Sequence, residues 1–187
     1  MVNVLKERAI HIIKAGLIPP GQNLCFSVSG YSMCPLLFPG YKVVASPQIN
    51  TDRICIGDLV VITDPQCSGI VVHRVVLIRK RKGKPVFFLT KGDGSRTFDK
   101  VIYSDQILGK VIAIKKENRF INLSKTSWRA AGFFIAVSSG ACGLMHRLIG
   151  RYPLSSGTIG LKIGFQIRRL FFLTHRMFIQ AVILSLS

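Results

Sequence analysis

A serine, a histidine and two aspartates are spaced so that they could form a nucleophilic catalytic site. Ser32 lies in a bend rich in glycine and proline, SGYSMCPLLFPG at 29–40. Because a serine hydroxyl is a weak nucleophile near neutral pH, it needs a positioned base, and imidazole suits that task best. His73 lies within the apolar run IVVHRVV, where a polar ring is unexpected unless it has a specific role. A carboxylate that orients the imidazole would complete the site, and Asp93 and Asp99 follow in one loop.

Each of these residues also has an ordinary structural interpretation. A serine in a Gly/Pro bend is most often a turn residue, and a single histidine in a strand is more often a hydrogen-bonded core residue. Gly-Asp pairs such as Gly92-Asp93 are common turns. The residues alone therefore leave a catalytic triad as one hypothesis beside the structural ones.

Short strands must position these side chains. Apolar alternation and branched residues predict six of them, at 24–29, 41–46, 56–63, 69–80, 85–90 and 106–116. The turn RKGK joins 69–80 to 85–90 as an antiparallel hairpin, which brings the loop after residue 90 toward His73. Short strands with Gly and Pro between them, and no alternation with helices, predict a mainly β fold with a compact antiparallel β domain.

The segments before and after this domain differ from it in composition and in hydrophobic pattern. Residues 1–23 predict a short amphipathic N-terminal helix and a linker, because Gly16 and Pro19-Pro20 end the helical pattern. The β-rich domain is expected over 24–122. Residues 123–187 predict a basic, apolar helical extension, with helices over 126–149 and 159–183.

The charge distribution favours an anionic membrane surface as a partner. The chain has a net charge of +18 over 187 residues, and its acidic residues all lie at or before Glu117. Beyond that point, arginine and lysine alternate with Phe, Ile and Leu, a composition more typical of interfacial helices than of nucleic-acid arms. The apolar run 130–145 is too short for a membrane span, and 170–187 is interrupted by His175 and Arg176.

The cysteines predict neither a metal site nor a disulfide framework. There are 5 of them, an odd number without a C-x-x-C pair, so we expect free thiols. No cofactor is predicted.

Four motifs in order resemble the type I signal peptidase family, specifically its endoplasmic-reticulum and archaeal branch with its Gram-positive relatives. They are Ser32-Met33 with Pro35, Gly57-Asp58-Leu59-Val60-Val61, His73-Arg74-Val75-Val76, and Thr90-Lys91-Gly92-Asp93 followed by Asp99. That branch reads S-M-x-P, G-D-(I/L)-V-V, H-R-V and T-K-G-D with a second aspartate. The resemblance spans roughly residues 26–115, which makes 24–122 the expected peptidase domain.

The resemblance implies a serine endopeptidase that cleaves a signal or leader peptide after small residues. In this branch Ser32 would be the nucleophile and His73 the general base, where most bacterial members have a lysine. Asp99 would orient His73, with Asp93 as the alternative. The oxyanion would be bound by the backbone N–H of Ser32, helped by a neighbour such as Ser29. A peptide or preprotein is then the substrate.

Two departures from the family pattern bear on these expectations. The family usually has Gly-Asp shortly after S-M-x-P, where this chain has Gly40-Tyr41, with Lys42 as a less well placed candidate base. Family members normally carry an N-terminal membrane anchor before the serine, whereas the residues before Ser32 do not predict a span. We therefore expect membrane association through the C-terminal part, peripheral or anchored, with a cytoplasmic location as the alternative.

Two other functions remain open on the sequence. One is a self-cleaving, repressor-like peptidase domain, although residues 1–23 are too short for the helix-turn-helix that such proteins carry ahead of it, and no lysine stands at the expected base position. The other is a non-catalytic basic module that binds membranes. Nucleic acid is not an expected partner, since no RNA- or DNA-binding motif is present.

Overall fold

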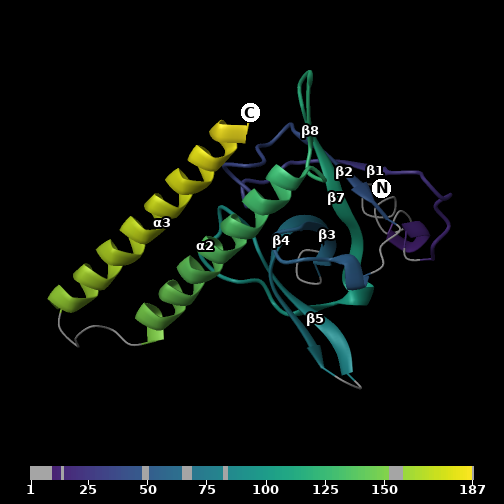
Figure 1. Ribbon diagram of the computed structural model, residues 1–187. Coiled ribbons are helices and arrows are strands. Elements are labelled where there is room, and N and C mark those ends of the chain that lie inside the picture. The colour runs from purple at the N-terminus through teal and green to yellow at the C-terminus, as the bar shows by residue number, and fades with distance from the viewer. Residues whose placement is uncertain are drawn as a thin grey trace.

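The computed structural model describes residues 10–13, 15–47, 51–64, 69–81, 84–151 and 158–186. Within these ranges, eight strands form one antiparallel sheet in the order β1-β2-β7-β3-β4-β5-β6, with β8 added to β7 (Figure 1). The strands are β1 (Leu24–Ser27), β2 (Lys42–Ser46), β3 (Leu59–Asp64), β4 (Gly69–Arg81), β5 (Lys84–Lys91), β6 (Ile102–Tyr103), β7 (Ile107–Lys116) and β8 (Arg119–Asn122). The mainly antiparallel β fold predicted from the sequence is confirmed.

The sheet is strongly curved and buries apolar side chains on both of its faces (Figure 1). Successive side chains of a strand point to opposite faces. On β3, Leu59 and Val61 belong to the larger core cluster, whereas Val60 and Ile62 belong to the smaller one. Register shifts, such as the one between Val61 and Ile62 opposite β7, are bulges that bend a sheet. The curvature gives the sheet the shape of a half-barrel.

Two long helices follow the sheet. Helix α2 spans Thr126–Arg151 and contacts β4, and helix α3 spans Thr158–Leu186 and packs against α2. The helices lie side by side, with α2 between α3 and the sheet (Figure 1). Both were predicted from the sequence, with slightly shorter bounds. Of the expected N-terminal helix, only 10–13 is described as helical, and most of its remainder lies outside the described residues.

Four short elements were not predicted. They are β6, β8 and two 3-10 turns, η1 (Thr51–Arg53) and η2 (Ser104–Gln106). A two-residue strand such as β6 is too short to show alternation in the sequence. Strand β8 depends on a tight turn at Glu117, whose φ of 49° lies in the left-handed region, an uncommon conformation for a residue other than glycine.

Candidate active site

Ser32, His73 and Asp99 lie within hydrogen-bond distance of one another in series. The Oγ of Ser32 is 3.1 Å from Nε2 of His73, and Nδ1 of the same imidazole is 2.6 Å from Oδ2 of Asp99. Ser32 is exposed, whereas His73 is almost fully buried. The nucleophile candidate is thus open to a substrate, and the imidazole between it and Asp99 has little freedom to turn away.

Strand pairing brings His73 and Asp99 together. In β4, His73 is paired with Val60 of β3, and the next residues of β4 are paired with the end of β5, Val75 with Thr90. The loop after β5 then returns to the same place. The backbone N–H of Asp99 donates to the Thr90 carbonyl at 3.0 Å, and the Thr90 hydroxyl donates to Asp99 Oδ2 at 2.8 Å. Thr90 therefore fixes the carboxylate that faces the imidazole.

The turn at 92–94 holds the Ser32 bend from the other side. The Gly94 N–H donates to the Ser32 carbonyl at 2.7 Å. A Cβ on Gly92 would lie only 2.5 Å from that same oxygen, so the approach requires glycine. Met33 and Leu37 are buried in the larger core cluster and anchor the bend below the exposed serine.

Asp93, the alternative orienting residue, forms its hydrogen bonds with Arg74 and not with His73. Its two carboxylate oxygens accept from Arg74, Oδ1 from Nε at 2.8 Å and Oδ2 from Nη2 at 2.6 Å. Both side chains are buried. The structure therefore places Asp99 beside His73 and gives Asp93 a paired, structural environment.

The other two residues singled out in the sequence lie apart from this group. Ser29 is exposed on the segment between β1 and Ser32, and Lys42 is exposed at the start of β2, paired in register with Lys115. Within the described ranges, neither side chain forms a hydrogen bond with Ser32, His73 or Asp99.

Sequence reasoning gave Lys91 no role of its own, although it ends β5 beside the site. The Lys91 side chain is fully buried, and its Nζ donates to Ser139 Oγ of α2 at 2.9 Å and to the Gly92 carbonyl at 3.3 Å. Burial lowers the pKa of this amine, because a low-dielectric interior disfavours the charged form. Lysine is almost never fully buried, so nothing in the sequence signalled this position.

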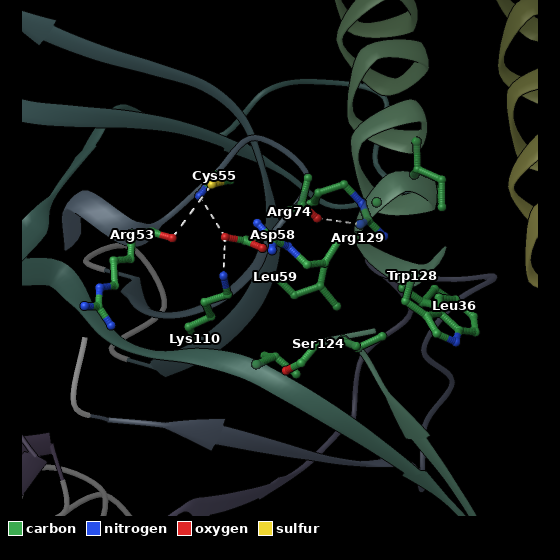
Figure 2. A pocket seen from close by; sticks show the side chains of 15 residues that line it. Leu36, Arg53, Cys55, Asp58, Leu59, Arg74, Lys110, Ser124, Trp128 and Arg129 are labelled. Carbon is green, nitrogen blue, oxygen red and sulfur yellow. Dashed lines mark hydrogen bonds and ion pairs between the residues drawn. The ribbon is translucent and has the colours of Figure 1, made fainter. Parts of the chain in front are cut away.

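A cavity of about 470 Å³ lies where α2 meets the sheet (Figure 2). Its lining includes the ion pair of Lys110 with Asp58 at 2.6 Å, and also Arg74 and Trp128. Ser32, His73 and Asp99 do not line this cavity, so it lies apart from the serine. In the described part of the chain no cluster of His, Cys, Asp or Glu could hold a metal ion, and the four described cysteines are free thiols.

The amino-acid sequence was compared with those of known proteins and protein families. No protein-family model matches the chain. A human protein named "Putative signal peptidase complex catalytic subunit SEC11B" is 24% identical over 173 residues, which cover 92% of this chain and 91% of the relative. The chain resembles a type I signal peptidase. This distant similarity supports a signal-peptidase-like function and indicates a peptidase.

One helix suggests that the protein associates with membranes. Among the described residues, Phe165–Leu186 of α3 is long and apolar enough to cross a membrane, judged by length and composition alone. Large apolar side chains are exposed on α3, including Leu170, Met177 and Leu184. Exposed apolar side chains gathered on one element often mark a contact surface.

Proposed function

We propose that this chain is a serine endopeptidase that removes a signal or leader peptide after small residues. Ser32 is the nucleophile, His73 the general base and Asp99 the carboxylate that orients the imidazole. The observation that carries the proposal is the continuous contact from Ser32 Oγ through the two nitrogens of His73 to Asp99, at 3.1 and 2.6 Å. The similarity to a signal peptidase subunit supports the substrate class.

In the proposed mechanism, each proton transfer involves a named atom. Nδ1–H of His73 donates to Asp99, which leaves Nε2 unprotonated and facing the serine. As Oγ of Ser32 attacks the scissile carbonyl carbon, its proton passes to Nε2. The imidazolium then protonates the leaving amine, the C–N bond breaks, and an acyl-enzyme remains. Water deprotonated by His73 hydrolyses the ester and restores the serine.

Backbone groups of the serine bend complete the proposed site. Among the described residues, the N–H of Ser32 donates to no other group, so it is free to bind the oxyanion. Ser29, exposed three residues earlier, is the proposed second donor. Such donors typically contribute about 10²–10³ in rate.

The sheet offers a place for an extended substrate next to His73. Strand β5 ends at Lys91, opposite Arg74 of β4. Residues 69–73 of β4 therefore have β3 on one side, while in the described residues no strand pairs with the other side. An extended peptide added there as a strand would pass His73 with its backbone in a fixed register.

A Ser-Lys mechanism has less support. Lys91 directs its amine to Ser139 and Gly92 rather than to Ser32, and Lys42 is exposed on β2. A self-cleaving, repressor-like peptidase with a lysine base is therefore the weaker candidate.

The deciding test is cleavage of a synthetic peptide with an apolar stretch followed by an Ala-x-Ala cleavage site. Ser32→Ala and His73→Ala should each lower turnover by roughly 10⁴–10⁶ while circular dichroism shows an unchanged fold. Full activity in Ser32→Ala would refute the proposal. A wild-type protein that binds vesicles but cleaves no such peptide would instead favour a non-catalytic membrane-binding module.

A further inference from the structure

Helix α2 contacts the chain immediately beside the residues of the proposed site. The first contact is between backbones at Gly132. A Cβ on Gly132 would lie 2.9 Å from the Gly57 carbonyl and 3.4 Å from Nη1 of Arg74, and one on Gly57 would lie 2.5 Å from the N of Phe133. Arg74 Nη1 also donates to the Gly57 carbonyl at 2.8 Å. Arg74 is the neighbour of His73 in β4, so α2 rests against the strand that carries the base.

The second contact is the hydrogen bond from Lys91 to Ser139, at 2.9 Å between two fully buried side chains. A buried amine must keep its hydrogen-bond partners, so this contact resists separation. Lys91 follows Thr90, whose hydroxyl donates to Asp99.

The third contact is between Gly143 and the ring of Phe98. A Cβ on Gly143 would lie 2.7 Å from Cζ of that ring. Phe98 directly precedes Asp99. Each of the three contacts is therefore one residue away in sequence from His73, Thr90 or Asp99.

The three α2 residues lie on one face of the helix, since they are seven and four positions apart. Arg74 and Lys91 also lie on one face of the hairpin formed by β4 and β5. Because side chains alternate along a strand, His73 and Thr90 point to the other face, toward Ser32. Figure 2 shows Arg74 where α2 meets the sheet, in the lining of a cavity that it shares with Trp128 and Arg129 of the helix.

We propose that α2 is a positioning element of the active site, in which Gly132, Ser139 and Gly143 fix His73 and Asp99 relative to Ser32. This inference rests on the proposed function. Helix α2 packs on the face of the β4–β5 hairpin opposite to the one that carries His73 and Thr90. It therefore affects the positions of the reacting groups and, among the described residues, makes no contact on the proposed substrate-binding side. A shift of α2 should therefore change kcat and leave KM alone.

A matched pair of alanine substitutions within α2 tests the proposal. Both Gly132→Ala and Gly140→Ala improve helix propensity equally, but a Cβ on Gly140 meets nothing within 4 Å. We expect Gly132→Ala to lower kcat by roughly 10- to 100-fold, as a displacement of about 1 Å would, with KM within twofold of wild type. Gly140→Ala should keep the wild-type kcat and raise Tm.

A second variant keeps the test informative if Gly132→Ala fails to fold. Gly143→Ala should lower kcat through Phe98, and Phe98→Leu should relieve the clash. The double variant should therefore match the kcat of Phe98→Leu alone, a non-additive result expected only of residues in contact. Equal kcat in Gly132→Ala, Gly143→Ala and Gly140→Ala would overturn the proposal, as would losses of kcat that only follow the fraction of folded protein.

An NMR measurement separates failure of this inference from failure of the proposed function. The Nδ1 proton of His73, if hydrogen-bonded to Asp99 at 2.6 Å, should give a downfield resonance, and observing it does not require turnover. If the wild-type protein cleaves no peptide, a shift of this resonance in Gly132→Ala but not in Gly140→Ala still supports positioning by α2. An unchanged resonance in both variants refutes it.

Discussion

At the scale of single residues, the two aspartates after β5 differ in what their carboxylates contact. Asp99 faces His73 and accepts from Thr90, whereas Asp93 forms a buried bidentate pair with Arg74. The residues alone left the choice open because both aspartates lie in one loop. In the sequence, only the resemblance favoured Asp99 as the partner of His73. In the structure, the two aspartates differ because the Asp93 carboxylate is buried against the guanidinium of Arg74.

This difference predicts that two isosteric substitutions affect different quantities, one the turnover and the other the stability of the fold. Asp99→Asn should lower kcat by about 10⁴, because the amide favours the wrong tautomer of His73, while the free energy of unfolding changes little. Asp93→Asn should destabilise the fold by about 3–5 kcal/mol, because it leaves the buried guanidinium of Arg74 without its counter-charge. Peptide kinetics and urea unfolding measure the two quantities. The assignment is wrong if Asp93→Asn stays as stable as wild type and loses activity as Asp99→Asn does.

At the scale of elements, the turn at 92–94 determines where the serine bend lies. Gly92→Ala would place a Cβ 2.5 Å from the Ser32 carbonyl and 2.7 Å from Ser95 Oγ. Since the contacted atom at Ser32 belongs to the backbone, the bend must move away from His73. We expect kcat to fall by about 100-fold in a protein that still folds.

Gly30→Ala is the control for this prediction because it lies in the same bend, where a Cβ would meet nothing within 4 Å. It should retain wild-type turnover in the same peptide assay. Comparable losses in both variants would show that the bend tolerates no added side chain, and the contact with Gly92 would then have no special role.

The longer elements were predictable, whereas their contacts were not. Alternation and branched residues predict the central strands within one or two residues, apart from the start of β3. The turn RKGK predicts the hairpin that brings residue 90 back toward His73. The docking of α2 has no such signal, because Gly132, Ser139 and Gly143 are small residues of an apolar helix. Their effect depends on a backbone approach that only tertiary structure creates.

At the scale of the whole molecule, basic charge and exposed apolar surface occur together in the C-terminal helices. The chain carries a net charge of +18, without an acidic residue beyond Glu117. Large apolar side chains are exposed on both α2 and α3, among them Phe134, Leu144 and Phe171. We propose that this surface binds an anionic membrane, where basic residues contact lipid headgroups and apolar side chains enter the interface.

Vesicle flotation of the full chain tests this surface. The protein should float with vesicles that contain anionic lipid and less with neutral ones, and added salt should weaken the attachment because it screens the charge. The triple variant Leu170→Glu, Met177→Glu and Leu184→Glu places acidic groups at exposed positions of α3 and should lose most binding while peptide cleavage in solution is retained. Leu77→Glu, at an exposed position of β4, is the control and should float as wild type does. If Leu77→Glu stops floating while the triple variant still floats, the membrane contact lies on the β4–β5 hairpin and not on α3.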